Sequence, residues 1–369
     1  MAVPQDAVIL IPSYHPDEKL GQYARDLIQA GFRRIVIVDD GSGPDYEGQF
    51  APLRGVEGIT LLQYPVNGGK GHALKHGLRH ILEAFPQAPG VVTADSDGQH
   101  TAADCTRVAG AMLEHPDKLV LGSRDFNSPD VPPKSKTGNR LTSFFFALLY
   151  GQWLPDTQTG LRGMAMSEVP RLAGVAGDRY EYEMNVLIHW AGWKRGFETV
   201  PIRTIYEDRN KGSHFRPLQD SARIYKLLFG NFARFASSSA LSALVDVGLF
   251  TALDKWVFPV AVPGLFSSRY GAVLAATAVA RVASSLFNFH LNRQFVFQFT
   301  RGSGALLRYL VLAAGVLLTS ATLVDAVNRL TGMDRTAAKI IIDLLLFFVS
   351  YRLQRTWVFP PEPKRSAQT

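Results

Sequence analysis

The sequence predicts an α/β domain with a parallel, doubly wound sheet, followed by an α-helical domain with four transmembrane helices. Short apolar segments alternate with helix-patterned segments in the first part of the chain. After residue 232 the composition changes to mostly Ala, Val, Leu, Phe and Ser, with few charges. Four apolar segments there each approach the ~20 residues needed to cross a bilayer.

The composition limits the class of protein. Lys and Arg outnumber Asp and Glu by 39 to 32, which gives a formal net charge of +7. An excess of base favours an anionic partner such as anionic lipid, a phosphorylated substrate or nucleic acid. Nucleic acid is disfavoured because the basic residues cluster beside the membrane segments, not among exposed aromatic side chains. The single cysteine, Cys105, excludes an internal disulfide and is typical of a reducing compartment.

Five short apolar segments predict the strands of the α/β domain. The first is soon followed by Asp17 and Glu18, so it indicates a buried strand and not a secretory signal. Between the early strands, apolar residues recur on one helical face, as in residues 20–28 and 74–85. In such folds ligands bind at the carboxyl ends of the strands. The predicted strands cover residues 7–14, 33–40, 58–64, 89–94 and 118–122.

A pair of carboxylates follows the fourth predicted strand. Asp95 and Asp97 can converge there on one hard cation, Mg²⁺ or Mn²⁺, and Gln99 can add a carbonyl oxygen. A departing diphosphate needs its charge neutralised by such a cation. The structural alternative is a solvated turn that leads into a helix capped by Thr101 and Asp104.

Two further segments carry residues suited to a nucleotide. Asp39 and Asp40 follow the second strand, where carboxylates can accept hydrogen bonds from base N–H groups and ribose hydroxyls. Lys70 lies in the segment Asn67–Gly71, whose glycines expose backbone N–H groups before a helix and so predict an anion site. It is not a P-loop, because Tyr64 stands where the first glycine belongs. For both segments a tight turn before a helix is the alternative.

A third group of residues is basic. Arg124 follows the fifth strand, and Lys134, Lys136 and Arg140 precede an apolar stretch at residues 141–154. This stretch is too short to span a bilayer, so we expect it to lie in the membrane interface with the basic residues directed at lipid phosphate. Arginine binds phosphate bidentately, which suits Arg124 and Arg140 to a substrate phosphate.

A second basic segment lies just before the membrane domain. Lys211 belongs to residues 209–214, which precede an amphipathic run. Ordinary attraction to anionic lipid is the alternative to phosphate recognition here. We favour that anchoring role for Arg223, Lys226 and Arg234.

The predicted spans lie near residues 233–253, 269–291, 305–327 and 337–353. Basic residues gather between the second and third spans and after the fourth, so the positive-inside rule places those sides and both termini in the cytoplasm. Asp246 and Arg281 lie near the middle of the first two spans. A lone charge at that depth costs a few kcal/mol, so we expect the two to pair.

The membrane part contains an internal repeat. Residues 287–297 read FNFHLNRQFVF and residues 349–359 read VSYRLQRTWVF, an offset of 62 (355 − 293 for the arginines). Two helical hairpins of the same orientation would explain it. The alternative is two membrane exits that share an arginine and an aromatic belt.

The strand ends IPSY, VDDGS, NGGKG and DSDGQH, in this order, resemble family 2 glycosyltransferases of GT-A fold, above all the dolichol- or polyprenyl-phosphate sugar synthases. Gly122–Arg124 and the segment DTQTGLR at residues 156–162 are the more specific parts, and the apolar tail resembles the GtrA family. The resemblance covers nearly the whole chain. It divides the chain into a GT-A (Rossmann-like) catalytic domain at 1–215, a juxtamembrane amphipathic helix at 216–231, a GtrA-like domain with four transmembrane helices at 232–359 and a cytoplasmic tail at 360–369.

The resemblance implies transfer of a hexosyl group from a GDP- or UDP-linked sugar to undecaprenyl or dolichyl phosphate, with inversion and with Mg²⁺ or Mn²⁺. The activity would be like that of dolichyl-phosphate mannosyltransferases or glucosyltransferases, at the cytoplasmic face of a bacterial inner membrane. The implied site residues are Asp95, Asp97 and Gln99 for metal; Pro12, Tyr14, Asp39, Asp40, Lys70 and Asp95 for the nucleotide; Arg124, Lys136, Arg140 and Lys211 for the acceptor phosphate; and Asp97, Arg124, Arg140 and Asp156 for catalysis.

The acceptor determines what catalysis requires. A lipid phosphate arrives as an anion, since phosphomonoesters have a second pKa of about 6, and so needs no general base. We therefore expect direct displacement at the anomeric carbon, driven by positioning and by neutralisation of charge. Asp156 is expected to orient Arg162 or another basic group. Glu181 and Glu183 are expected to shape the acceptor side.

Two other functions compete with this interpretation. A processive polysaccharide synthase usually carries a Gln-x-x-Arg-Trp motif, which the sequence lacks, and four spans are few for a polymer channel. A flippase or carrier of the sugar-lipid would use the GtrA-like domain, and one chain could perform both tasks. Neither the sugar nor the association of several copies of the chain follows from the sequence.

Overall fold

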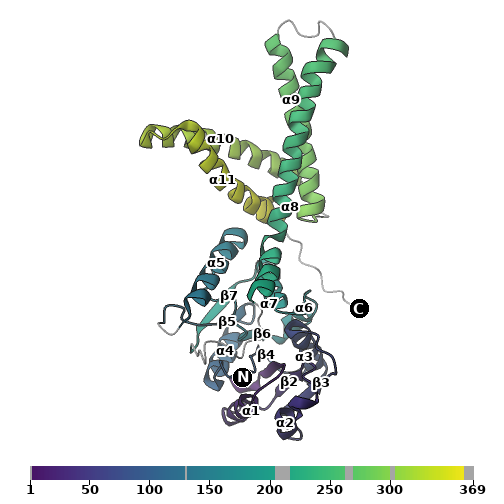
Figure 1. Cartoon of the computed structure of the whole chain (residues 1–369), viewed down its shortest axis with the longest axis vertical. Helices are drawn as coiled ribbons and strands as arrows, with labels where there is room; N and C mark the ends of the chain where they lie inside the picture. Colours follow the sequence, from purple (N-terminus) through teal and green to yellow (C-terminus); the bar gives the residue numbers. More distant parts are fainter. Residues whose placement is uncertain (1, 129–130, 204–216, 262–268, 300–303, 361–369) are drawn as a thin grey trace. The chain divides into compact units, whose positions relative to one another are not determined.

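A computed structural model describes residues 2–128, 131–203, 217–261, 269–299 and 304–360. The chain forms two compact units, Met1–Leu228 and Phe229–Thr369. The first unit contains a sheet with helices around it, and the second is helical (Figure 1).

A seven-stranded sheet forms the centre of the first unit, in the order β3-β2-β1-β4-β6-β5-β7. Each of the five predicted strands is present, within two residues at either end. β6 and β7 are additional strands that the sequence analysis did not identify. The strands are β1 (Val8–Ser13), β2 (Ile35–Asp39), β3 (Ile59–Gln63), β4 (Gly90–Thr93), β5 (Leu119–Ser123), β6 (Arg162–Ala165) and β7 (Phe197–Pro201).

The sheet is mixed, which corrects the prediction of a wholly parallel sheet. β6 pairs antiparallel with both β4 and β5, whereas the other described pairings are parallel. The reason lies in the loop before β6. Thr93, at the carboxyl end of β4, donates from Oγ1 to the carbonyl oxygen of Gly160 at 2.7 Å. The chain therefore enters β6 from the edge where β4 ends, and β6 must run in the opposite direction.

Helices pack on both faces of this sheet, which explains why its central strands are continuous apolar runs. Ile9 and Ile11 of β1 belong to a core cluster with side chains of α1 and α4. Leu10 points to the other face, where a Cβ on Gly77 of α3 would collide with it. The helices of this unit are α1 (Lys19–Gln29), α2 (Glu47–Phe50), α3 (Lys70–Ala84), α4 (Ala102–Glu114), α5 (Pro133–Tyr150), α6 (Val169–Ala173), α7 (Glu181–Gly192) and the beginning of α8.

The second unit consists of four long helices in its described part. Residues 217–231, predicted as a juxtamembrane helix, form the start of α8, which continues without interruption into the first predicted span. α8 ends in a π-helical segment, Leu253–Ala261. The helices are α8 (Pro217–Ala252), α9 (Arg269–Leu291), α10 (Ala305–Thr331) and α11 (Arg335–Leu353).

Three helices in the described part of the chain are long and apolar enough to cross a membrane: Gln219–Phe258, Arg269–Val296 and Ala305–Thr331. The fourth predicted span coincides with α11, which has 19 residues. α11 is not among the three, since it carries Arg335, Lys339, Asp343 and Arg352.

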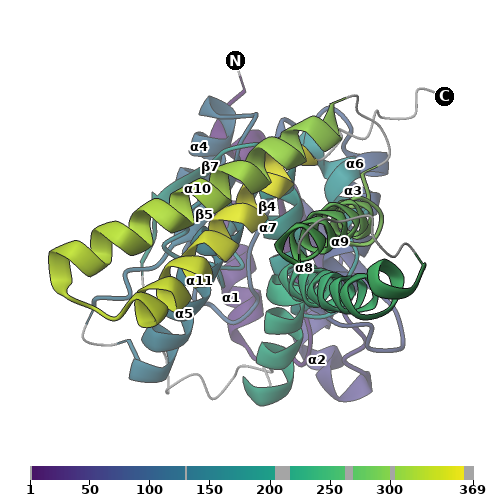
Figure 2. The ribbon, with the colours of Figure 1, turned by 90° about the horizontal axis from the view of Figure 1, so that it is seen from above.

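The two similar segments of the sequence have similar structures and contact each other. α8 and α9 lie side by side, as do α10 and α11 (Figure 2). Both repeat segments end in π-helical turns at equivalent places, Asn292–Val296 and Gln354–Val358. Asn292 Nδ2 donates to Gln354 Oε1 at 3.0 Å. The rings of Phe297 and Phe359 stack with centroids 5.3 Å apart. Residues 62 positions apart therefore meet each other where the two hairpins join.

The predicted charge pair in the first hairpin is also confirmed. Arg281 NH2 lies 3.1 Å from Asp246 Oδ2, and Ser284 Oγ donates to Asp246 Oδ1 at 2.9 Å. In the second hairpin Asp343 accepts from Ser320 Oγ at 2.5 Å and lies 2.7 Å from Lys339 Nζ. Each hairpin thus satisfies one aspartate within its own pair of helices.

Candidate active site

A cleft of about 690 Å³ opens at the carboxyl ends of β1, β2 and β4. These strands are adjacent and parallel, so the residues that follow them meet at one edge of the sheet. The volume is typical of a small-molecule site. Seven of the predicted site residues line the cleft: Pro12, Tyr14, Asp40, Lys70, Asp95, Asp97 and Gln99.

The Lys70 ammonium lies between Asp95, which lines this cleft, and Glu183, which lines a smaller cavity. Its Nζ is 2.7 Å from Asp95 Oδ1 and 3.0 Å from Glu183 Oε2. Lys70 is the first residue of α3, and Glu183 lies in the first turn of α7. Burial disfavours the charged form, but Asp95 and Glu183 outweigh it and hold the pKa of Lys70 well above its usual value. Lys70 is therefore a permanent cation at neutral pH.

Asp95 is engaged on both of its oxygens. Lys70 contacts Oδ1, and the buried His100 places Nε2 3.3 Å from Oδ2. Burial would raise the pKa of Asp95, but Lys70 and His100 hold it well below its usual range. The backbone of Gly160 packs directly against this carboxylate and leaves no room for a Cβ. His100 was not singled out in the sequence, where it follows the acidic motif as an ordinary loop residue.

Asp97 carries the acidic charge that the cleft leaves least compensated. Its Oδ1 accepts from the backbone N–H of Gln99 at 3.0 Å. Burial and the neighbouring charge of Asp95 raise the pKa of Asp97. Two carboxylates that repel each other in this way would be stabilised by a cation.

The acidic residues of the cleft do not form a complete metal site by themselves. Within the described ranges no three His, Cys, Asp or Glu side chains converge as a metal site. Asp95 and Asp97 fit Mg²⁺ or Mn²⁺ when further oxygens come from water and substrate phosphates, as is usual for Mg²⁺. The two acids and the amide of Gln99 therefore suit a metal that arrives with its substrate, and do not suit a preformed cage.

Asp40 lines the cleft, but its carboxylate is already saturated by the protein. It accepts from Tyr64 Oη at 2.7 Å, from Asn67 Nδ2 at 2.9 Å and from the backbone N–H groups of Gly68 and Gly69, each at 2.8 Å. The glycine N–H groups predicted to bind a ligand anion are thus bound to Asp40. Of the predicted anion site, Lys70 is the positive group that faces the cleft.

Asp39 does not line the cleft. Its Oδ1 accepts from the backbone N–H of Ser42 at 2.9 Å, and its Oδ2 accepts from Gln63 Nε2 at 3.1 Å. It stabilises the turn after β2, which is the structural alternative considered for this segment. Thr101 and Asp104 likewise form the expected capping box at the start of α4.

An aromatic stack at the cleft was missed by sequence reasoning. The rings of Tyr14 and His15 stack at 3.8 Å, and those of His15 and Tyr46 at 4.2 Å with an interplanar angle of 4°. His15 has a positive φ of 49° and its N–H donates to Ser42 Oγ at 3.0 Å. All three aromatic residues line the cleft. No periodic pattern in the sequence predicts such a stack, because the stack depends on the geometry of the turns after two different strands.

The predicted basic group forms around Arg124, outside the residues that line the cleft. Arg124 Nε and NH2 donate to the two carboxylate oxygens of the buried Asp156 at 2.7 and 3.1 Å. Asp156 thus orients Arg124 and not Arg162. Arg140 NH2 donates to Asn127 Oδ1 at 3.0 Å.

Helix α5 is tied to the loop that carries Asp156. Asn139 Nδ2 donates to the carbonyl of Pro155 at 2.5 Å, and its Oδ1 accepts from the N–H of Thr157 at 3.1 Å. Arg140 and the half-buried Lys136 therefore belong to the same framework as Asp156. Lys211 and the side chain of Lys134 lie outside the described residues.

The far side of the cleft comes from α7 and the start of α8. Arg223, which we favoured as a lipid anchor, lines the cleft instead, and its NH1 lies 3.3 Å from Asp220 Oδ1. Burial raises the pKa of Tyr180, also in the cleft, to about 12. The position of this segment at the sheet edge was not predictable from the sequence, because it depends on tertiary packing.

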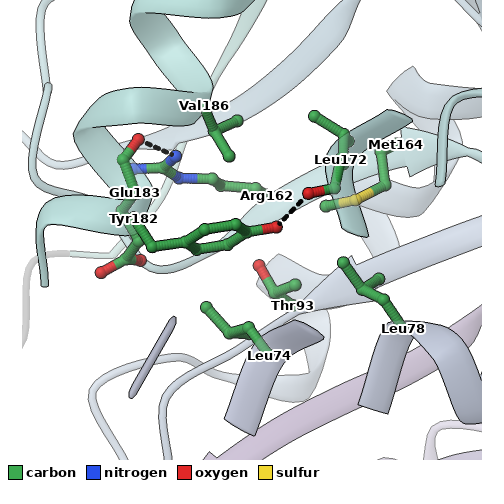
Figure 3. Close-up of a pocket in the computed structure, with 9 residues that line it drawn as sticks. All are labelled: Leu74, Leu78, Thr93, Arg162, Met164, Leu172, Tyr182, Glu183 and Val186. Atoms are coloured by element: carbon green, nitrogen blue, oxygen red, sulfur yellow. Dashed lines mark hydrogen bonds between the residues drawn. The ribbon is translucent and has the colours of Figure 1, made fainter. Parts of the chain in front are cut away.

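Behind the cleft, a cavity of about 20 Å³ is lined in part by the buried Arg162 (Figure 3). Arg162 NH1 donates to the carbonyl of Glu183 at 2.8 Å, and Tyr182 Oη donates to the carbonyl of Leu172 at 2.9 Å (Figure 3). These bonds hold the first turn of α7 in place. Arg162 therefore acts on the cleft through the backbone that presents Glu183.

The fold and the cleft define a glycosyltransferase of Rossmann-like GT-A type. Residues 8–169 match the model of glycosyl transferase family 2, and residues 234–359 match the model of the GtrA/DPMS transmembrane domain. The chain therefore consists of a family 2 glycosyltransferase domain joined to a GtrA/DPMS transmembrane domain. Together with the three long apolar helices, the second domain makes this a membrane protein.

Several known proteins are similar to the chain. An uncharacterized protein of Methanocaldococcus jannaschii is 27% identical over 224 residues, which cover 60% of this chain and 90% of that protein. The UDP-N-acetylglucosamine–dolichyl-phosphate N-acetylglucosaminyltransferase of Methanococcus voltae is 28% identical over 220 residues, which cover 54% of this chain and 86% of that enzyme. The crystal structure of mannosyl-3-phosphoglycerate synthase from Rubrobacter xylanophilus is 16% identical, with a TM-score of 0.46, covering 63% of this chain and 74% of that one.

Proposed function

We propose that this protein transfers a hexosyl group from a GDP- or UDP-linked sugar to a polyprenyl phosphate. The observation that carries the proposal is an acidic, lysine-containing cleft at the sheet edge of a family 2 glycosyltransferase domain joined to a membrane domain. A similar enzyme is named for a nucleotide sugar and a dolichyl phosphate acceptor, which supports the same kinds of substrate here.

The donor would lie in the 690 Å³ cleft. Asp95, Asp97 and Gln99 would hold Mg²⁺ or Mn²⁺, which would neutralise the departing diphosphate. The aromatic stack of Tyr14, His15 and Tyr46 lines the cleft together with Pro12, and the nucleobase would pack against this stack. Lys70 supplies a permanent positive charge on the same side of the cleft.

The acceptor phosphate would be held by Arg124, Lys136 and Arg140, with Lys211 from the segment before α8. Asp156 accepts two hydrogen bonds from Arg124. These bonds fix the orientation of the Arg124 guanidinium plane. Leu141, Phe144 and Trp153 expose 45%, 53% and 60% of their surface, respectively, on and just after α5. Such apolar exposure beside basic residues suits contact with a membrane interface.

The reaction we propose is a direct displacement with inversion. A phosphate oxygen of the lipid attacks the anomeric carbon, the bond to the nucleoside diphosphate breaks, and no proton needs to leave the nucleophile. The carboxylates most easily mistaken for a base each accept at least one contact within the protein. Asp156 binds Arg124, Glu183 binds Lys70, and Glu181 Oε1 accepts from the N–H of Asp178 at 3.2 Å.

The protein would reside in a bacterial inner membrane, with the catalytic domain and both termini in the cytoplasm and four spans between them. The basic residues between α9 and α10 and after α11 support this orientation by the positive-inside rule. The donor would then come from the cytoplasmic pool of nucleotide sugars.

Movement of the sugar-lipid across the membrane is a second candidate function for the GtrA/DPMS domain. The observation that favours it is a network of amides and hydroxyls inside this domain. Asn288 contacts Ser242 and Tyr309 at 3.0 and 3.1 Å, and Asn292 contacts Gln354 at 3.0 Å. Polar residues within membrane spans often mark a pathway. Vesicles that contain the chain alone would test whether added glycosylated lipid phosphate reaches the opposite leaflet.

A transfer assay with purified full-length protein tests the main proposal. Nucleotide sugars would be paired with undecaprenyl or dolichyl phosphate, and lipid products read by mass spectrometry. We expect a lipid phosphate that has gained one hexosyl unit, with release of nucleoside diphosphate. Asp97→Asn should abolish the product, and near-normal turnover by that variant in chelator would refute the metal assignment. Free sugar or a polymer in place of the lipid product would contradict the proposal as a whole.

A further inference from the structure

The cleft already contains a cation, and it is part of the protein. Lys70 Nζ lies 2.7 Å from Asp95 Oδ1, the carboxylate expected to bind the metal. His100 is 3.3 Å from the other oxygen of Asp95. Both oxygens of Asp95 are therefore engaged before any metal arrives.

Lys70 is held in this place from two directions. Its other partner is Glu183, at 3.0 Å, whose carbonyl accepts from the buried Arg162 at 2.8 Å. The start of α3 packs tightly against the segment before α7, since Cβ atoms on Gly69 and Gly71 would collide with it. The N–H of His72 donates to the carbonyl of Asp178 at 2.9 Å. The ammonium is thus fixed by the packing of two helices.

We propose that Lys70 keeps metal off Asp95 until a nucleoside diphosphate draws the ammonium away, with Glu183 holding it during the exchange. The inference rests on the proposed function, in which Asp95 and Asp97 bind the metal of the donor. It makes Lys70 a residue that couples the binding of metal and nucleotide.

The charges of the cleft explain the coupling. A divalent cation that approaches Asp95 meets an ammonium on the same carboxylate, and the two cations repel each other. A diphosphate offers that ammonium a new anionic partner, while Glu183 keeps it from leaving the cleft. Metal and nucleotide then each strengthen the binding of the other, because linkage between two ligands is reciprocal. The metal would therefore bind only weakly between turnovers, when no nucleotide is present.

The test is a titration of the full chain with Mn²⁺, followed by electron paramagnetic resonance, with and without UDP or GDP. For the wild type we expect weak Mn²⁺ binding that tightens strongly when the nucleotide is present. For Lys70→Met we expect Mn²⁺ alone to bind about tenfold or more tightly than in the wild type, and the nucleotide to add little, within the usual range of such coupling.

Lys75→Met is the matched control. Lys75 lies on the same helix and pairs with Asp178 at 2.6 Å, but it does not line the cleft. The Lys75→Met variant loses one positive charge, as Lys70→Met does, but at a place outside the cleft. Its Mn²⁺ affinity should therefore stay close to that of the wild type. If both variants bound Mn²⁺ more tightly to the same degree, the loss of one positive charge anywhere on the helix would explain the effect. That result would overturn the proposal.

Lys70→Met leaves two half-buried carboxylates without their cation, which can prevent folding. The double variant Lys70→Met, Glu183→Gln removes one of these charges and should also bind Mn²⁺ more tightly than the wild type. If metal and nucleotide bind but neither variant gains Mn²⁺ affinity, the role of Lys70 is refuted while the donor site stands. If no variant binds Mn²⁺ even with nucleotide, the metal site of the proposed function fails, and this inference fails with it.

Discussion

At the scale of single residues, the contact between Asp156 and Arg124 separates two accounts of catalysis. Asp156 is buried and accepts hydrogen bonds from Nε and NH2 of Arg124, so we expect it to position Arg124 and not to accept a proton. If Asp156 were a general base, the reaction rate would depend on its ionisation and would therefore change with pH.

Asp156→Asn should therefore lower kcat about 10²-fold, the usual cost of disturbing one charged contact to the transition state, without removing a limb of the pH–rate profile. The measurement is turnover against pH with saturating donor and lipid, after binding of both has been verified. Glu181→Gln and Glu183→Gln serve as comparisons. A variant that loses activity together with a pH-dependent limb would identify a base and contradict direct displacement.

Cys105 gives a second residue-level prediction, about packing. It is fully buried between α4 and α1, with its Sγ 3.1 Å from Tyr23 Oη. Burial raises the pKa of the Cys105 thiol to about 12, far above the ordinary value of about 8.5. The reactive thiolate should therefore be negligible at pH 8 in the folded protein.

We expect no labelling of the native protein by a thiol reagent at pH 8, and one label per chain after denaturation. Since Cys105 is the single cysteine, the count is unambiguous. Rapid labelling of the folded protein would mean that α1 and α4 do not pack as described.

The residues of the site were predictable where they follow apolar strands. Asp95, Asp97 and Lys70 line one cleft because the strands and helix that present them were recognisable by pattern. Their partners were not predictable. Glu183 lies far along the chain, on a helix whose position next to Lys70 depends on tertiary packing. The hydrogen bonds from the glycine turn to Asp40 depend on φ values that a sequence does not reveal.

At the scale of elements, the short antiparallel β6 shows why the prediction of a parallel sheet failed. A strand of four residues has too little pattern to distinguish it from a loop, and its direction is set by where the preceding loop is anchored. The long elements were predictable, because α8, α9 and α10 carry sustained apolar composition. The repeat was recognisable because the same arginine and aromatic pattern closes two helices.

The pair of Asp246 and Arg281 is the element-level prediction. The two side chains join α8 to α9 at 3.1 Å, and an unpaired charge within a span costs a few kcal/mol. Asp246→Arg and Arg281→Asp should each lower the yield of folded protein, and the double reversal should recover part of it. Size-exclusion chromatography in detergent measures the recovery. Strictly additive losses would show that each charge is satisfied separately.

At the scale of the whole molecule, the account joins a donor site in one domain to a membrane domain in the same chain. Its topology is testable apart from its chemistry. By the positive-inside rule, the arginines between the second and third predicted spans and after the fourth would place the carboxyl terminus in the cytoplasm. Reporters fused after Thr369 should give the cytoplasmic signal, and reporters inserted within residues 262–268 should give the opposite one. A carboxyl-terminal reporter active on the outer side would refute the orientation.

The most direct measurement compares polyprenyl phosphate with the corresponding polyprenol as acceptor for the purified protein, with the nucleotide sugar that supports transfer. A phosphate acceptor is already an anion at neutral pH, whereas an alcohol must lose its proton to a general base, which the proposed direct displacement does not use. The account predicts a hexosyl lipid phosphate with inverted anomeric configuration and no detectable product from the alcohol. Equal glycosylation of the alcohol, or retention of configuration, would contradict it.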